Sequence, residues 1–332
     1  MNAKPIVCAT DLSEVSRAAL RQARALAQWE GCDLHVVQTG PDAQALSLAR
    51  RAAAAGDEFR SPGGDDRERH TCVVREGHPV DAVVEYAREV GARLIVVGTA
   101  MPRAGVSQRE SIGEMIARRA TCPTLVVPTG LQSTHEDLPF RTIVCAVDLS
   151  PGSVAASEEA IRLALAAEGK LTLLHVLAEF GDAPTLATYV VPDYRQRRTV
   201  EAYERLSESI PREARERAHI NLQVLPGDAG QRILSLAARL GADLIVMGVT
   251  PRSRLSRLLL GSTSHRVTAE SACPVLVIPS AAATTAWESQ HEPRQPRAQL
   301  RAPMAVPPDY VAEATGRVAH AQARLAATVP RA

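Results

Sequence analysis

Short apolar runs alternate with amphipathic stretches along most of the chain. Runs such as 5–10 and 93–98 have the length and continuity of strands that are buried on both faces of a parallel sheet. The stretches between them carry apolar residues at helical spacing and begin at residues that cap helices, such as Ser13. We therefore expect strands near 5–10, 33–38, 71–76, 93–98 and 124–128, with helices near 13–29, 41–55, 78–90 and 109–121.

The same pattern occurs a second time. Pro5–Ser13 returns as Thr142–Ser150, and Cys122–Pro128 returns as Cys273–Pro279, the latter at an offset of 151 positions (273−122). The chain is thus an internal duplication of a unit of domain size. In the second copy, strands are expected near 142–147, 170–176, 219–225, 243–248 and 275–279.

Alternation of strands and helices predicts two tandem doubly wound α/β domains, each with a five-stranded parallel sheet. We place the first at 1–130, a linker at 131–139, the second at 140–280, and a C-terminal extension with a weak amphipathic helix at 281–332. The edge strands at 124–128 and 275–279 are expected to join the domains as a pseudo-twofold pair within one chain, which would cover both edges. Further association of two chains into a homodimer is left open.

Composition narrows the function classes. Lys and Arg number 38 against 37 Asp and Glu, a net charge of +1, so nothing in the overall charge points to nucleic acid or to a membrane surface. No apolar run is long enough to span a bilayer, and the N-terminus lacks a signal-peptide pattern. The six cysteines show no metal-binding or redox spacing. A cytoplasmic protein without a metal site of its own is expected.

The most informative stretch follows the strand that ends at Gly248. An arginine-rich loop leads to Gly261, which is followed by the hydroxyl residues Ser262, Thr263 and Ser264 at the start of a predicted helix. Glycine allows close backbone approach, and hydroxyls at a helix N-terminus add donors beside its positive end. The pattern indicates a phosphate cradle, with plain helix capping as the alternative.

These residues resemble the universal stress protein family. The resemblance rests on the Val-Cys-Ala-x-Asp-Leu-Ser opening, Gly227-Asp228, the Gly-Ala-x-Leu-Ile-Val-x-Gly strand and the Cys-Pro-x-Leu-Val-x-Pro close. It implies an adenine nucleotide alpha hydrolase-like fold. Many members of the family bind ATP through Gly, two residues, Gly, nine residues, Gly and then Ser or Thr, whereas others lack this pattern and bind no nucleotide.

The second copy keeps most of that pattern. Gly248 and Gly261 match the outer glycines, but Pro251 occupies the middle position and removes an amide donor. Arg252, with Arg254 and Arg257, either compensates as a phosphate donor or belongs to a solvated loop.

The resemblance also assigns the rest of the nucleotide site. Ala146, Val147 and Asp148 would border the adenosine, and Val176 and Met247 would form an apolar wall. Asp148 could equally cap the following helix.

The first copy departs further. Gly98 is kept, but Met101 replaces the middle glycine, and Glu110 and Ser111 stand where Gly261 and Ser262 stand. A carboxylate beside a phosphate is repulsive. The first domain is therefore interpreted as having lost ATP binding.

No catalytic constellation is evident. His35 and His175 occupy equivalent strand positions and are interpreted as core or strand-end residues, and His265 as a surface residue or a ligand neighbour. The charged stretch within 178–218 is interpreted as a solvated helix. The sequence favours a non-catalytic, ATP-binding stress-response regulator, with ATP or a related adenine nucleotide, with or without Mg²⁺, and an unidentified protein partner. A nucleotide-free scaffold and, less favoured, a slow ATP hydrolase are the alternatives.

Overall fold

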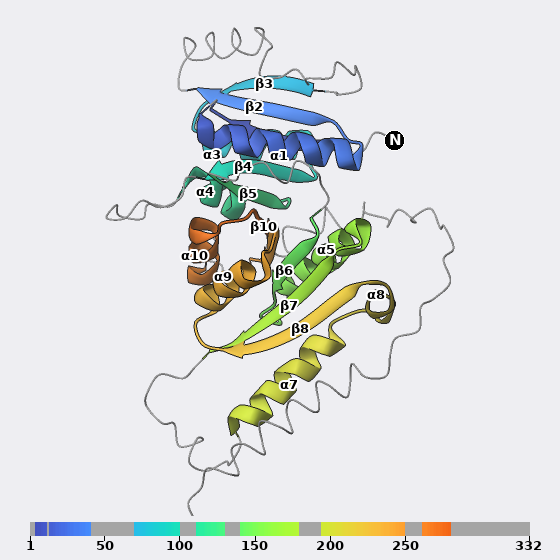
Figure 1. Ribbon diagram of the computed structural model, residues 1–332. Helices are drawn as coiled ribbons and strands as arrows, with labels where there is room; N and C mark the ends of the chain where they lie inside the picture. The colour runs from blue at the N-terminus through green and yellow to red at the C-terminus, as the bar shows by residue number, and fades with distance from the viewer. Residues whose placement is uncertain are drawn as a thin grey trace, which may run out of the picture. The chain divides into compact units, whose positions relative to one another are not determined.

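The expected alternation of strands and helices is present in both repeats of the computed structural model (Figure 1), which describes residues 4–11, 13–40, 70–99, 111–129, 140–178, 194–249 and 261–279. In the first repeat the strands are β1 (Ile6–Thr10), β2 (Leu34–Gly40), β3 (His70–Glu76), β4 (Leu94–Thr99) and β5 (Thr124–Pro128). The helices are α1 (Glu14–Glu30), α3 (Pro79–Glu89) and α4 (Ile112–Arg119).

The second repeat follows the same order. Its strands are β6 (Thr142–Ala146), β7 (Lys170–Leu177), β8 (His219–Pro226), β9 (Leu244–Gly248) and β10 (Val275–Ile278). Its helices are α5 (Pro151–Ala167), α7 (Tyr194–Glu208), α8 (Arg212–Arg217), α9 (Ala229–Leu240) and α10 (Ser262–Glu270). The predicted helix at 41–55, the linker at 131–139 and the extension at 281–332 lie outside the described residues.

The strands form one sheet in the order β3-β2-β1-β4-β5-β10-β9-β6-β7-β8. Each repeat contributes five parallel strands, and β5 joins β10 in the antiparallel sense with Leu125 opposite Leu276. These two leucines are equivalent in the duplication, since 125+151=276. Equivalent residues thus face each other across a pseudo-twofold axis, and the predicted edge-to-edge domain pair is confirmed.

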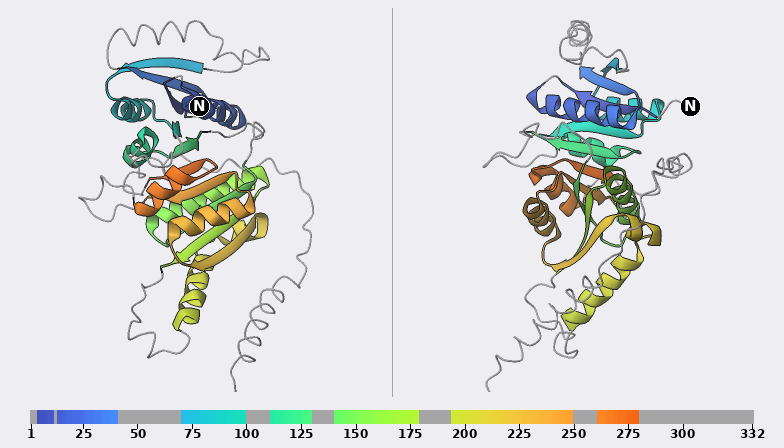
Figure 2. Two further views of the ribbon diagram at one scale, coloured as in Figure 1. Left: turned by 60° about the vertical axis from the view of Figure 1, so that its left-hand side comes forward. Right: turned by 45° about the vertical axis from the view of Figure 1, so that its right-hand side comes forward.

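Two helix layers cover the two faces of the sheet (Figure 2). Alternate strand residues supply two cores, so that Cys145 packs with α1, α5, α7 and α8 while Val144 packs with α3, α4, α9 and α10. A five-stranded parallel sheet buried in this way is the doubly wound α/β fold, and the predicted fold class is confirmed.

Helix starts follow the expected capping. Ser13 and Ser150 accept hydrogen bonds from the backbone N–H groups of Ser16 and Ser153, and Asp228 caps α9 at Gln231. The C-caps of α1 and α5 share a backbone conformation but differ in residue type. Gly31 and Glu168 both take the left-handed conformation, with φ of 63° and 50°. That conformation is favourable for glycine and costly for glutamate.

Four of the six cysteines are buried, and all six thiols are free. Cys8 and Cys145 are fully buried in β1 and β6, whereas Cys72 is exposed. Burial raises the pKa of Cys8 and of Cys122 to about 12, which keeps these thiols protonated and unreactive.

Candidate functional site

The predicted adenosine residues lie at the carboxyl end of the second repeat's sheet. Ala146 ends β6, and Val147 and Asp148 follow it, while Val176 and Met247 lie near the ends of β7 and β9. Ala146, Val176 and Met247 pack on the α9–α10 face, whereas Val147 is buried on the α5 face. The structure therefore brings the two wall residues onto one face and separates Val147 from them.

Asp148 organises the turn from β6 into α5. Its Oδ1 accepts hydrogen bonds from the backbone N–H of Ser150 (3.0 Å) and from the Ser150 hydroxyl (2.5 Å), and Ser150 in turn caps the helix. Partial burial raises the pKa of Asp148, but the hydrogen bonds from Ser150 and Ser153 outweigh it, so the pKa lies below its ordinary value. Leu149 completes the turn at a φ of 63°. Asp148 thus holds the turn in place and keeps a negative charge at the sheet end.

Gly248 is a glycine for reasons of packing. A Cβ at this position would lie 2.2 Å from the carbonyl oxygen of Gly152 in the first turn of α5. Gly98 in the first repeat meets the carbonyl oxygen of Val15 in the same way, at 2.5 Å. The close approach of α5 to the end of β9 is sufficient to explain the glycine at position 248, and no ligand is needed to account for it.

The phosphate half of the predicted site begins at Gly261, the N-cap of α10. Gly261 is exposed, its φ of −57° and ψ of 150° suit any residue, and a Cβ there would meet no atom of the described residues within 4 Å. Ser262 is exposed, Thr263 is half-buried and Ser264 is buried. Within the described part of the chain, no side chain caps the first turn of α10. Pro251 and Arg252, with the other loop arginines, lie outside the described residues.

The equivalent helix start in the first repeat is closed by its own side chains. The Ser111 hydroxyl accepts from the Glu114 N–H (3.2 Å), and the Glu114 carboxylate accepts from the Ser111 N–H (2.7 Å). This capping box uses amides that a phosphate would need. Met101 and Glu110 lie outside the described residues.

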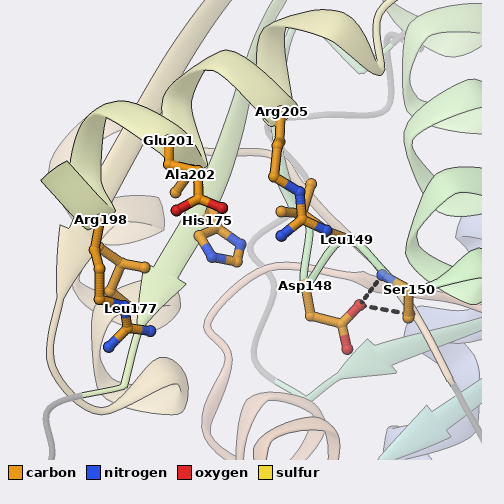
Figure 3. A pocket seen from close by; sticks show the side chains of 9 residues that line it. All are labelled: Asp148, Leu149, Ser150, His175, Leu177, Arg198, Glu201, Ala202 and Arg205. Carbon is orange, nitrogen blue, oxygen red and sulfur yellow. Dashed lines mark hydrogen bonds between the residues drawn. The ribbon is translucent and has the colours of Figure 1, made fainter.

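A cavity that the sequence did not predict opens beside Asp148 (Figure 3). It has a volume of about 330 Å³ and lies between the turn after β6, the end of β7 and helix α7. Its walls are formed by Asp148, Leu149, Ser150, His175, Leu177, Arg198, Glu201, Ala202 and Arg205. The α7 residues belong to the charged stretch that was interpreted as solvated; that interpretation was incomplete, since Arg198 and Arg205 line a cavity while Leu206 is buried in the core.

The two strand histidines, His35 and His175, have different surroundings. The Nδ1 atom of His175 lies 2.7 Å from the carbonyl oxygen of Val147, an arrangement in which Nδ1 carries the proton and donates. His35 instead places Nδ1 2.8 Å from the Tyr86 hydroxyl. The predicted equivalence of the two histidines is wrong, because His35 lies beside Val7, whose counterpart Val144 lies beside Thr172 and not beside His175. His35 is near the start of β2, whereas His175 is near the end of β7 and lines the cavity.

His265 does not lie on an isolated surface. Its Nδ1 is 3.0 Å from Glu114 Oε1 of the first repeat, and its side chain is 31% exposed. It therefore lies at the junction of the two repeats, which corrects the surface interpretation.

Two doubly wound repeats joined edge to edge define a tandem α/β protein, a fold in which ligand sites lie outside the carboxyl ends of the strands. The model of the universal stress protein family matches residues 2–128 and 139–279. The chain therefore belongs to the universal stress protein family and carries two copies of its domain.

Individual relatives agree with this assignment. Universal stress protein YxiE of Bacillus subtilis is 30% identical over 146 residues, which covers 42% of this chain and 99% of that protein. Universal stress protein MJ0531 of Methanocaldococcus jannaschii is 28% identical over 142 residues, covering 42% of this chain and 82% of that protein. Each match thus corresponds to about one repeat.

Among solved structures, a universal stress protein from Archaeoglobus fulgidus superposes with a TM-score of 0.55 at 20% identity, covering 84% of this chain and 97% of that one. The protein PA1789 of Pseudomonas aeruginosa gives 0.56 at 18% identity, with coverage of 86% and 96%. These likenesses extend over both repeats and concern the fold. No helix in the described residues is long and apolar enough to cross a membrane.

Proposed function

We propose that this chain is an ATP-binding stress-response protein with a regulatory role, and that its second repeat holds the nucleotide. The observation that carries the proposal is the difference between two equivalent helix starts. In α4 the amides of the first turn are engaged by the Ser111–Glu114 capping box, whereas no described side chain caps the first turn of α10.

The start of α10 suits a phosphate group. Its first N–H groups and the hydroxyls of Ser262 and Thr263 stand beside the positive end of the helix dipole, and a Cβ on Gly261 would meet no described atom within 4 Å. Ser264 is only 7% exposed, so its contribution would come from its backbone N–H. The arginines from Arg252 onward are part of the proposal as charged donors that neutralise the phosphates.

The adenosine would lie against Val176 and Met247, on the α9–α10 face, with Asp148 at the end of β6. Asp148 also lines the cavity under α7, on the other side of β7. The adenosine site and that cavity therefore share one carboxylate and otherwise use different side chains. A magnesium ion would arrive with the phosphates and be held by them and by the hydroxyls of α10.

The chain's own residues would bind and orient the nucleotide, and a protein partner would respond to its presence. We propose no catalytic step. The six free thiols, four of them buried, support a reducing compartment, and a cytoplasmic location belongs to the proposal.

A nucleotide-free scaffold is the competing function. It is favoured by Pro251, which replaces the middle glycine of the ATP pattern and lacks an amide donor. Slow ATP hydrolysis is the third candidate function. Its test is whether the purified protein releases phosphate from ATP.

Calorimetric titration of the full chain with Mg-ATP tests the proposal. We expect binding at about one site per chain, abolished in Gly261→Glu, which places a carboxylate where the phosphates would lie. Gly261→Ala is the matched control, because the backbone conformation suits any residue and a methyl group there would meet no described atom within 4 Å. It should fold normally and keep most of the affinity.

Three outcomes would change the assignment. Two sites per chain would show that the first repeat also binds nucleotide. Equal binding by wild type and Gly261→Glu would place the phosphates elsewhere. No binding by a folded wild-type sample, with no co-purified nucleotide, would leave the scaffold function.

A further inference from the structure

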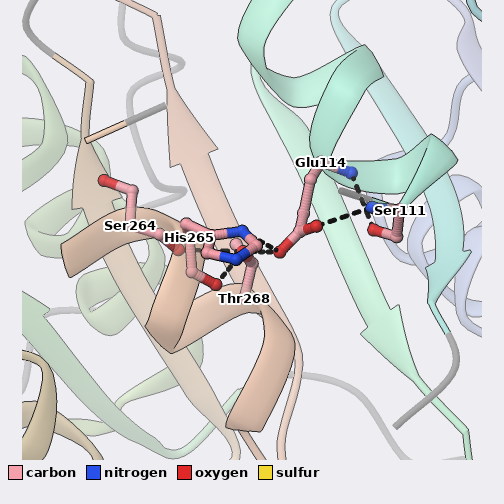
Figure 4. A network of polar contacts seen from close by, with 5 residues as sticks. All are labelled: Ser111, Glu114, Ser264, His265 and Thr268. Carbon is pink, nitrogen blue, oxygen red and sulfur yellow. Dashed lines mark hydrogen bonds and ion pairs between the residues drawn. The ribbon is translucent and has the colours of Figure 1, made fainter. Parts of the chain in front are cut away.

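One buried carboxylate of the first repeat contacts the candidate phosphate helix of the second. Glu114, on α4, is 1% exposed. Its Oε1 accepts a hydrogen bond from the Thr268 hydroxyl (2.9 Å) and lies 3.0 Å from His265 Nδ1, while its Oε2 accepts from the Ser111 N–H (2.7 Å). Figure 4 shows this carboxylate between the two helices. Its two oxygens thus tie the start of α4 to α10.

The contact follows from the pseudo-twofold symmetry of the chain. Positions 114 and 265 are equivalent, since 114+151=265, and equivalent positions meet near the axis that passes between Leu125 and Leu276. Two identical domains would place like side chains opposite each other here. The duplication has allowed one position to become an acid and the other an imidazole, which complement each other.

The partners of Glu114 form hydrogen bonds with the predicted phosphate turn. The backbone N–H of His265 donates to the carbonyl oxygen of Gly261 (3.0 Å), and the Thr268 hydroxyl also lies 2.8 Å from the carbonyl oxygen of Ser264. Residues 261–264 are the turn whose amides and hydroxyls would face the phosphates. Glu114, which belongs to the other repeat, is therefore connected to the turn through a single intervening residue, either His265 or Thr268.

We propose that Glu114 is a positioning residue, supplied by the first repeat, that fixes the phosphate-binding turn of the second. This inference rests on the proposed function for the identity of the ligand. A buried carboxylate with several hydrogen-bond donors has one favourable geometry. It holds α10 at a fixed position relative to the sheet, so the amides of residues 262–264 are oriented before the ligand arrives. The first repeat, although its own helix start is closed, would thereby complete the site of the second.

The test uses the full chain with Glu114→Gln, which keeps the size of the side chain and removes its charge. Glu89→Gln is the matched control, since Glu89 is an exposed residue of the same repeat that pairs with Arg75 away from the junction. Three quantities are measured: amide hydrogen exchange at residues 262–268 without ligand, the affinity for Mg-ATP and the affinity for adenosine, the last two by calorimetry.

We expect exchange at 262–268 to become about five- to tenfold faster in Glu114→Gln, and the Kd for Mg-ATP to rise by a similar factor, because a charge-assisted hydrogen bond has been weakened. Adenosine affinity should stay unchanged, because adenosine does not use the turn. Glu89→Gln should match the wild type in all three measurements. His265→Gln removes the same contact from the α10 side and serves if Glu114→Gln does not fold.

Unchanged exchange at 262–268 overturns the inference, whether or not the wild type binds ATP. So does an Mg-ATP affinity equal to or above that of the wild type, or a parallel loss of adenosine affinity, which would indicate general damage. If exchange is faster but the wild type binds no nucleotide, the proposed function fails and the ligand-positioning role fails with it.

Discussion

Asp148 shows how one side chain can serve both the fold and a site. Its carboxylate accepts two hydrogen bonds from Ser150, which caps α5, and the same carboxylate forms part of a cavity wall. The turn contains Leu149 in the left-handed conformation, which a leucine adopts only when its surroundings compensate for the cost. The hydrogen bonds of Asp148 are part of that compensation.

The depressed pKa of Asp148 makes its contribution to stability depend on pH. A carboxylate whose folded-state pKa lies below the ordinary value of 3.8 stabilises the fold above that value and ceases to do so as the pH falls through the folded-state pKa. Asp148→Asn should therefore be less stable than the wild type at pH 6, and the difference should shrink as the pH is lowered below 3.8. Urea unfolding from about pH 2.5 to about pH 6 measures this difference in stability between the two proteins. The range brackets the ordinary carboxylate pKa of about 3.9. A difference that is constant over the range would contradict the assigned role.

Glu168 offers a second test at a single residue. It ends α5 at a φ of 50°, where the equivalent helix α1 ends at Gly31, and its side chain is exposed. Glu168→Gly should raise the free energy of unfolding by about 0.5–1 kcal/mol, because the relief of left-handed strain exceeds the entropy that glycine adds to the unfolded chain. Gly31→Ala, a change away from glycine at the equivalent position of the first repeat, should lower the free energy of unfolding, although a Cβ there meets no described neighbour within 4 Å. Thermal unfolding of both variants gives the sign of each change in the free energy of unfolding.

At the scale of elements, the sheet end and α5 are in direct backbone contact. Because a Cβ on Gly248 would lie 2.2 Å from the Gly152 carbonyl oxygen, Gly248→Ala should destabilise the chain by about 1–3 kcal/mol without any ligand present. Gly261→Ala should leave stability unchanged. Denaturant unfolding of the ligand-free proteins distinguishes the two glycines, and equal stability of both variants would show that Gly248 is free to serve a ligand alone.

Strands and helices could be predicted from the sequence because each repeat buries its strands on both faces and caps its helices with local side chains. The repeat offset also predicted which strand edges would meet. Helix α7 could be predicted as an element, but not its function: Arg198, Glu201 and Arg205 have the spacing of a solvated face, and only the packing of α7 over the end of β7 places them around a cavity. Glu114 was missed for a different reason. Its partner lies 151 positions away, and its contact follows only when the repeat offset is combined with the edge-to-edge pairing (265−114=151).

For the molecule as a whole, the junction rests on more than the paired edges. Arg162 of α5 lies 3.6 Å from Glu30 of α1 and 2.6 Å from Glu159, so an ion-pair cluster joins the repeats on the α1–α5 face. The Glu114–His265 contact joins them on the opposite face. The repeats are thus in contact on both faces of the sheet and through the central strands β5 and β10. A structural change in the second repeat can therefore be transmitted to the first through these contacts.

The antiparallel pairing of β5 with β10 also sets a delay during synthesis. β5 begins at Thr124 and its partner at Val275, so 151 further residues (275−124) must be made before the edge of β5 is covered. At about 5–20 residues per second this takes about 8–30 s, while the first repeat is already able to fold. During that interval a nascent chain that has completed its first repeat presents an open strand edge, which can pair with the same edge of a neighbouring chain before its own partner exists. We therefore expect the speed of translation between residues 130 and 275 to affect how much of the product forms the intramolecular sheet.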